Sequence, residues 1–181
     1  MQRPGTMLRK EYIYNLKTTN IMRMTLLTTS FAMLLTLCLS TFSDAAAQEL
    51  RYIFKSGQEG YACFRIPAVV RTNEGHLLAF AEGRKNGCSD TGSIDLVMKR
   101  SEDDGQTWGP LQLIWHDEGN TCGNPAPIVE QQSGDILLLA TRNLGEDHES
   151  EIIAQTSTDT RRVYVLRSVD AGQSWSAPQE I

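Results

Sequence analysis

The chain carries two copies of a short pattern, Ser-x-Asp-x-Gly-x-Thr/Ser-Trp, at residues 101–108 and 168–175. Each copy closes a unit that begins with an apolar run, continues through a glycine turn and enters a second apolar run. Repetition of this kind is typical of propellers and other repeat architectures, and four strand-like pieces per unit correspond to one propeller blade. We align the runs 66–70 with 126–129, and 77–81 with 136–140, which pairs Pro67 with Pro127.

Everything from Gln48 onward has the pattern of short β-strands. Apolar or alternating runs are separated by turn residues such as Asn73-Glu74-Gly75, and no stretch has sustained helical periodicity. We interpret the polar insert 145–162 as a loop at a blade rim. The sequence predicts an all-β fold in which each unit is a four-stranded antiparallel sheet and the two sheets pack face to face. The strand-like runs between Gln48 and the second unit are 51–55, 64–71, 76–81, 94–100 and 111–115.

The residue types of the repeated pattern are those that stabilise a tight turn. Its aspartate can accept hydrogen bonds from the turn backbone, its glycine can take a positive φ, and its tryptophan can pack between sheets. We interpret both copies as structural clips between the third and fourth strands, with no catalytic role. The first clip consists of Ser101, Asp103, Gly105, Thr107 and Trp108, and the second clip of Ser168, Asp170, Gly172, Ser174 and Trp175.

Residues 1–47 differ in kind from the rest. Five basic residues precede or open an apolar run at 24–39, and Ala45-Ala46-Ala47 follows it, which together describe a secretory signal peptide. The run is shorter than the roughly 20 apolar residues that a membrane-spanning helix needs, so a membrane anchor is the weaker alternative. We expect cleavage near Ala47, a mature part at 48–181, and a secreted or periplasmic protein.

The mature part is acidic, with 12 Lys and Arg against 20 Asp and Glu and a net charge of −8. This charge argues against nucleic acid as a partner, because phosphates require a basic face. Export permits disulfides, but Cys63, Cys88 and Cys122 are odd in number, so their pairing stays open. No His or Cys spacing resembles a metal site, and we expect no metal and no cofactor.

A single arginine, Arg65, stands in the apolar run 63–70, two residues before Pro67. Proline restricts this run to an edge strand, a strand start or a bulge. A buried arginine needs an anionic partner, so Arg65 either reaches water or an ion pair, or lies in a cleft that receives a carboxylate or phosphate.

The two clips resemble the Asp-boxes of sialidases and related propellers, and Phe64-Arg65-Ile66-Pro67 resembles the narrower FRIP motif of sialidases. Glu82-Gly83-Arg84 and the loop with Asp90 fall where that family places a second arginine and its acid/base aspartate. Asn124-Pro125 resembles a segment with a substrate-contacting residue. The resemblance covers residues 50–181. It implies the N-terminal portion of a bacterial-type exo-α-sialidase, with about the first two blades of a six-bladed β-propeller.

The resemblance also implies roles. Arg65 matches an arginine that binds the carboxylate of sialic acid, and Arg84 an auxiliary arginine near the acid/base loop. Asp90 matches the general acid that protonates the departing glycosidic oxygen, and Asn124 a substrate contact. The tyrosine nucleophile and two further arginines are expected beyond Ile181, so the implied activity is retaining hydrolysis of terminal sialic acid by the whole enzyme. This fragment is expected to be inactive.

Simpler interpretations stand beside these. Arg84 can be a solvated loop charge, Asp90 a turn-capping residue and Asn124 an ordinary residue before a proline. The expected partners are sialylated glycans, with no nucleic acid and no stable membrane anchor. The alternative function is a non-catalytic Asp-box propeller that binds glycan or protein, and a weaker one is a glycosidase with two carboxylates. The trio of Arg65, Arg84 and Asp90 favours the sialidase.

Overall fold

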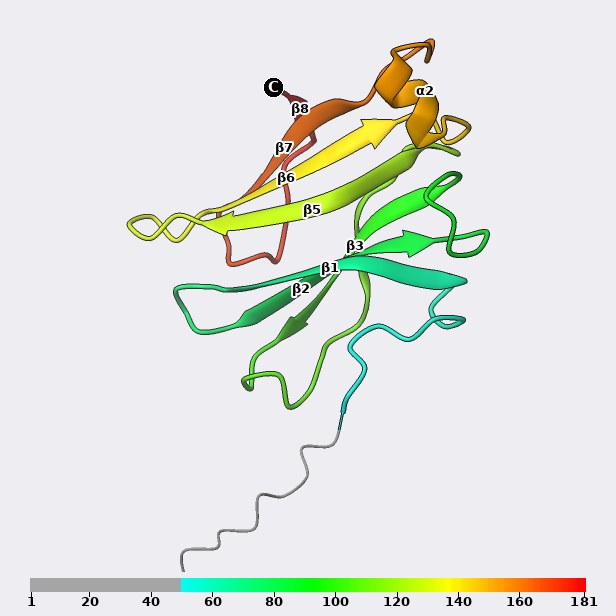
Figure 1. Cartoon of the computed structure of the whole chain (residues 1–181). Helices are drawn as coiled ribbons and strands as arrows, with labels where there is room; N and C mark the ends of the chain where they lie inside the picture. The colour runs from blue at the N-terminus through cyan, green and yellow to red at the C-terminus, as the bar shows by residue number, and fades with distance from the viewer. Residues whose placement is uncertain (1–49) are drawn as a thin grey trace, which may run out of the picture. The chain divides into compact units, whose positions relative to one another are not determined.

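The computed structural model describes residues 50–181, so the predicted signal peptide lies outside the described residues. Its first four strands form an antiparallel sheet, which we call the first blade (Figure 1). These strands are β1 (Cys63–Arg71), β2 (Leu77–Arg84), β3 (Ile94–Ser101) and β4 (Gln112–Trp115).

The next four strands repeat this arrangement and form the second blade. A parallel pair between Ile94 of β3 and Thr121 of β5 joins the two blades. The strands do not close into a ring, and the predicted all-β architecture of two propeller blades is confirmed. The second blade consists of β5 (Thr121–Val129), β6 (Ile136–Asn143), β7 (Arg162–Ser168) and β8 (Gln179–Glu180), with helix α2 (Glu149–Ala154) between β6 and β7.

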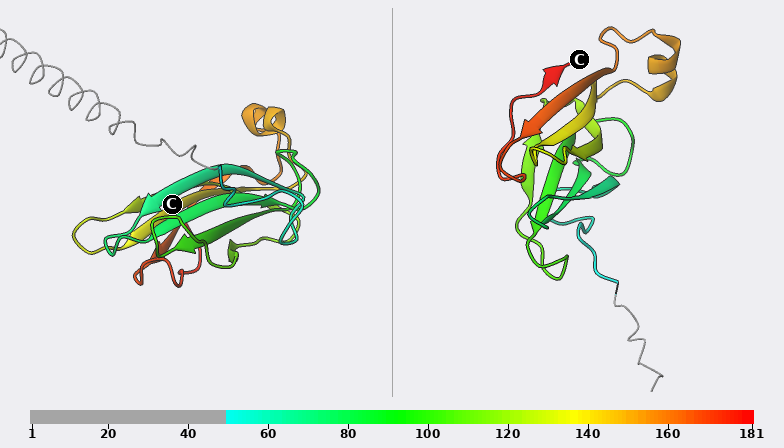
Figure 2. Two further views of the ribbon diagram at one scale, coloured as in Figure 1. Left: turned by 90° about the horizontal axis from the view of Figure 1, so that it is seen from below. Right: turned by 90° about the vertical axis from the view of Figure 1, so that its left-hand side faces the viewer.

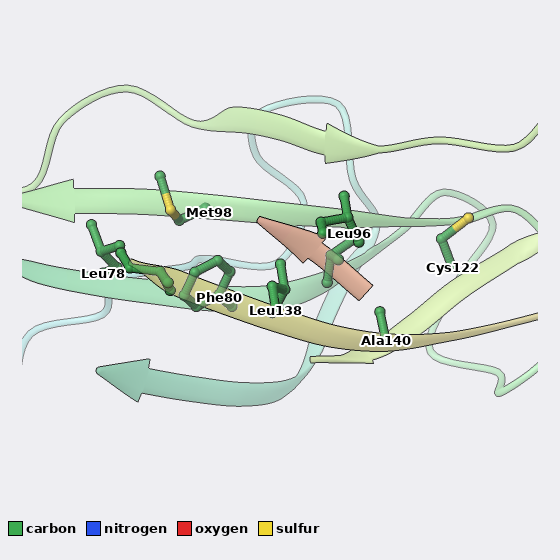
Figure 3. Close-up of a cluster of buried hydrophobic side chains, with 9 residues drawn as sticks. Leu78, Phe80, Leu96, Met98, Cys122, Leu138 and Ala140 are labelled. Atoms are coloured by element: carbon green, nitrogen blue, oxygen red, sulfur yellow. The ribbon is translucent and has the colours of Figure 1, made fainter. Parts of the chain in front are cut away.

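The main hydrophobic core lies between the two blades, as expected for sheets packed face to face. Figure 3 shows Leu78, Phe80, Leu96 and Met98 of the first blade beside Cys122, Leu138 and Ala140 of the second. Strand β2 is buried along nearly its whole length because it is a central strand with apolar residues at successive positions. This shared core fixes how the ends of the strands of the two blades lie relative to each other.

Strands β1 and β5 each contain a β-bulge that places a proline in the strand. The register shifts between Arg65 and Ala68 in β1 and between Gly123 and Ala126 in β5. The residues before the two prolines, Ile66 and Asn124, have φ of 52° and 54°. The structure therefore pairs Pro67 with Pro125, and our alignment of Pro67 with Pro127 was wrong by two residues. A β-branched residue in this left-handed region is rare, so the bulge at Ile66 is strained.

The two clips have almost the same hydrogen bonds. In the first, Asp103 accepts from the backbone N–H of Thr107 at 2.8 Å and from its hydroxyl at 2.6 Å, while Ser101 accepts from Gly105 N–H at 2.8 Å. In the second, Asp170 and Ser168 make the corresponding bonds to Ser174 and Gly172. Trp175 packs edge-on against Phe80 of the first blade, with ring centroids 5.7 Å apart. Each clip lies between the third and fourth strands of its blade.

Two expectations about local structure were wrong. Residues 51–55 form no strand; instead Phe54 packs on Phe64, with ring centroids 5.3 Å apart, and Lys99 lies over the ring of Phe54. The polar insert 145–162 contains helix α2 and is not entirely a loop. The helix has six residues, too few for a helical periodicity to be visible in the sequence.

Candidate active site

The candidate site lies at one end of the strands, where β2, β5 and the insert end or begin. The loop 85–93, which follows β2, and helix α2 lie at this same end (Figures 1 and 2). The backbone N–H of Gly92 donates to the carbonyl of Gly145 at 2.6 Å, and Thr121 donates to the carbonyl of Gly92 at 3.1 Å. A pocket of about 180 Å³ opens there. Its lining includes Ile66, Glu82, Arg84, Asp90, Ile94, Thr121, Asn124, Asp147, Glu149 and Arg161.

Two arginines converge on one oxygen of Asp90. The Oδ1 atom of Asp90 lies 2.9 Å from a guanidinium nitrogen of Arg65 and 2.7 Å from one of Arg84. The Asp90 side chain is 74% exposed, whereas that of Arg84 is 3% exposed. The hydrogen bond from Arg84, with the positive charges of Arg84, Arg65 and Arg161, lowers the pKa of Asp90 below its usual value. Asp90 is thus a carboxylate held by guanidinium groups.

Arg84 is oriented by a buried carboxylate and by the loop that carries Asp90. Its Nε and a terminal nitrogen donate to Glu82 at 3.0 and 2.6 Å. Its other terminal nitrogen donates to the carbonyls of Cys88 and Ser89, each at 2.7 Å. Glu82 and Arg84 share one face of β2 because alternate residues of a strand point the same way. All the nitrogens of this buried guanidinium therefore have partners.

Glu82 connects the two blades at the site. Its Oε1 accepts the backbone N–H of Asn124 at 3.0 Å, and the side chain of Asn124 donates to Thr141 at 2.8 Å. Gly123 allows this approach, since a Cβ at that position would lie 2.3 Å from Glu82 Oε1. The bulge in β5 thus presents Asn124 toward the pocket and lets its backbone reach a carboxylate of the first blade.

The insert forms one wall of the pocket. Asp147, which is buried, accepts a hydrogen bond from Ser157 at 2.5 Å, and Arg161 donates to Asn143 at 3.0 Å. Gly145, where the insert begins, packs against another loop, and a Cβ there would lie 1.9 Å from the carbonyl oxygen of Gly119. The same Cβ would lie 3.1 Å from the carbonyl oxygen of Gly92, so the start of the insert lies close to the loop 85–93.

A disulfide joins Cys63, at the start of β1, to Cys88 in the loop 85–93. Cys63 precedes Arg65 by two residues and Cys88 precedes Asp90 by two residues, so the bond links the two segments that meet at the site. Cys122 is a free cysteine in the core, and burial raises the pKa of its thiol to about 12. The pairing that the sequence left open is thus settled, with Cys122 as an inert buried thiol.

A second polar cluster lies beside the site without facing the pocket. Asp95, which is buried in β3, accepts the hydroxyl of Tyr61 at 2.8 Å and contacts Nδ1 of His116 at 2.7 Å. Lys85 lies 3.1 Å from the same carboxylate. Burial and the bond to Asp95 raise the pKa of Tyr61. This tyrosine is therefore a neutral hydrogen-bond donor in the wall of the fold.

The structure brings together all four residues predicted for catalysis or substrate binding. Arg65 contacts Asp90, while Arg84, Asp90 and Asn124 line the same pocket. Their roles stay predictions. Sequence reasoning assigned no role to Glu82, although the Glu-x-Arg spacing on a strand is a usable signal. It also missed Asp147, Glu149 and Arg161, whose position depends on how the insert folds back.

Two further classes of feature are absent from the described part of the chain. Within residues 50–181, no group of three or more His, Cys, Asp or Glu side chains has an arrangement that could hold a metal ion. Over that same range, no helix is long and apolar enough to cross a membrane.

The sequence pattern of the BNR repeat-like domain family matches residues 75–181. An exo-alpha-sialidase of Aspergillus fumigatus is 33% identical over 138 residues, which are 67% of this chain and 34% of that protein. The chain therefore spans about a third of the length of this curated relative.

Solved structures have the same fold. The Hadza microbial sialidase Hz136 superposes with a TM-score of 0.62 at 29% identity, covering 70% of this chain and 27% of that one. The Trypanosoma rangeli sialidase in complex with 2,3-difluorosialic acid, described as a covalent intermediate, gives a TM-score of 0.55 at 21% identity. It covers 67% of this chain and 21% of its own.

Proposed function

Because the chain belongs to the BNR repeat-like domain family and is related to sialidases over part of their length, we propose that it is the N-terminal part of an exo-α-sialidase. The observation that carries the proposal is the convergence of Arg65 and Arg84 on Asp90 at the mouth of a pocket. The whole enzyme would remove terminal sialic acid from glycoconjugates. The carboxylate of that sugar is the planar anion that a guanidinium binds through two parallel hydrogen bonds.

In this proposal, Arg65 binds the substrate carboxylate and Asp90 donates a proton to the departing glycosidic oxygen. Arg65 suits its role because its side chain is 44% exposed and open to a ligand. Arg84 is enclosed by Glu82 and by backbone carbonyls, so it holds the acid loop rather than the sugar carboxylate. Asn124 and the insert residues Asp147, Glu149 and Arg161 supply polar contacts around the sugar.

The arrangement also supplies a way for Asp90 to gain its proton. Asp90 pairs with Arg84 and Arg65, and the hydrogen bond from Arg84 together with both positive charges lowers the pKa of Asp90. A substrate carboxylate that takes over Arg65 removes one cationic neighbour from Asp90 and adds an anionic one. Both changes raise the pKa of Asp90, toward the range that a general acid needs.

We further propose that retaining hydrolysis is completed by a tyrosine nucleophile outside residues 50–181, and that the protein is exported. A tyrosine suits the reaction because the reacting carbon already carries a carboxylate, which would repel a carboxylate nucleophile. The Cys63–Cys88 disulfide supports export, since such bonds persist in oxidising compartments.

The test is Asp90→Asn in the full-length protein that contains these residues. A natural sialoside should lose roughly 10²- to 10⁴-fold in kcat/KM, because its leaving group needs a proton. A nitrophenyl sialoside should lose much less, because nitrophenolate leaves without one. Asp104→Asn is the matched control, since Asp104 is also an exposed aspartate paired with an arginine, Arg71, but belongs to the first clip region. Equal losses on both substrates would remove the acid role from Asp90.

A further inference from the structure

The loop 85–93 that carries Asp90 has almost no packing of its own. Cys88, Ser89 and Asp90 are exposed, and Gly87 and Gly92 have positive φ with no neighbouring atoms around the position of a Cβ. A glycine-rich segment without apolar anchors gains little from burial and retains much conformational freedom. Something other than the core must hold it in one conformation.

Three kinds of contact restrain this loop. At its base, Lys85 N–H donates to the carbonyl of Ser93 at 3.1 Å, and Gly92 bonds to Gly145 and Thr121. In its middle, Arg84 donates to the carbonyls of Cys88 and Ser89. The covalent restraint is the disulfide from Cys88 to Cys63, a residue that is itself 4% exposed and part of β1.

We propose that the Cys63–Cys88 disulfide positions Asp90: it holds the acid loop over β1 so that the Asp90 carboxylate meets Arg65 and Arg84. The bond acts through geometry, because it attaches the residue two before Asp90 to the residue two before Arg65. With the bond open, the part of the loop that carries Asp90 has no covalent link to β1 and is held by hydrogen bonds and ion pairs, so Asp90 samples positions away from both guanidinium groups. The effect of the disulfide on catalysis rests on the acid role proposed above for Asp90. Its effect on the position of Asp90 does not depend on that role.

The titration of individual aspartates by NMR tests the positioning in the 181-residue chain, without any activity. In the oxidised protein Asp90 should titrate below the ordinary value for aspartate of about 3.9. After reduction, or in Cys63→Ala/Cys88→Ala, its midpoint should rise toward that value. Asp103 and Asp170, which have pKa values of about 2 in the clips, are internal controls and should not move.

Two outcomes of the titration would overturn the proposal. An unchanged Asp90 midpoint with the bond open would mean that the hydrogen bonds and ion pairs of the loop hold Asp90 without the disulfide. A joint shift of Asp90, Asp103 and Asp170 would mean that the bond maintains the whole sheet rather than the loop.

A second measurement separates the positioning from the sialidase proposal. In the full-length protein, opening the bond should lower kcat/KM on a natural sialoside by about tenfold or more and change turnover of a nitrophenyl sialoside much less. A general loss of fold would lower both. If the Asp90 midpoint rises without this difference between substrates, the disulfide positions Asp90 as proposed and the acid role of Asp90 fails.

Discussion

At the scale of single residues, Glu82 decides how the site is held. It is 3% exposed, and its two oxygens bind the guanidinium of Arg84 and the backbone of Asn124, which come from different blades. A buried charge that loses its partner lowers the stability of the fold. Glu82 and Arg84 therefore stabilise the protein only as a pair. The carboxylate thus links the acid loop, through Arg84, to the bulge that presents Asn124.

This gives a prediction about stability. Glu82→Gln should lower the free energy of unfolding of the 181-residue chain by about 3 kcal/mol, because Arg84 remains charged and buried with only the exposed Asp90 as an anionic partner. Glu82→Gln/Arg84→Met should recover much of this loss, which a double-mutant cycle in urea would measure. Glu180→Gln, which breaks the exposed pair with Arg162, is the control and should change the free energy of unfolding much less. Additive losses in the cycle would contradict the coupling of Glu82 to Arg84.

At the scale of elements, the two clips fasten the ends of β3 and β7 with aspartates that function only when ionised. Hydrogen bonds from Thr107 lower the pKa of Asp103 to about 2, and hydrogen bonds from Ser174 do the same for Asp170. Folded-state values below the unfolded value mean that this stabilisation is fully present above about pH 4. It is lost as the pH falls from there through about 2.

We therefore predict that acid unfolding of the chain lies mainly between about pH 4 and pH 2. Asp103→Asn and Asp170→Asn should each lower the urea midpoint at pH 7 and make it less dependent on pH in that window. Glu102→Gln, next to the first clip but outside its hydrogen bonds, is the control. Its urea midpoint should fall with pH between about pH 4 and pH 2 as in the wild type. A wild-type-like pH dependence in both Asp→Asn variants would show that the clips do not govern acid stability.

Sequence patterns predicted the elements that obey local rules and missed those set by tertiary contacts. The predicted strand 64–71 became β1 (Cys63–Arg71), because alternation and β-branched residues are local signals. The bulge was misaligned because Ile66 adopts a positive φ against its own preference, which only the surrounding strands impose. The disulfide partner of Cys63 could not be predicted, because the spacing of cysteines in the sequence does not give the distance between them in the fold. The position of Arg161 in the pocket wall could not be predicted either, because it depends on how the insert folds back.

At the scale of the whole molecule, the described residues contain only some of the groups that the proposed reaction needs. The proposed acid Asp90 and the proposed carboxylate-binding Arg65 are present, but within residues 50–181 no tyrosine lines the pocket that contains Asp90. Tyr61 donates its hydroxyl to the buried Asp95, and Tyr164 packs its ring against Trp115. A general acid with no nucleophile to form the covalent intermediate cannot complete retaining hydrolysis.

The last prediction follows from this division. The 181-residue chain should release no sialic acid from a natural sialoside or from a nitrophenyl sialoside, whereas the full-length protein should act on both. Free sialic acid, measured by a chemical assay, is compared for the two lengths of chain. Asp90→Asn in the full-length protein is the reference for an enzyme that lacks only its proposed general acid. Turnover by the 181-residue chain at the rate of the full-length protein would place the nucleophile within this chain. A tyrosine of this chain would then supply the nucleophile, contrary to the proposal.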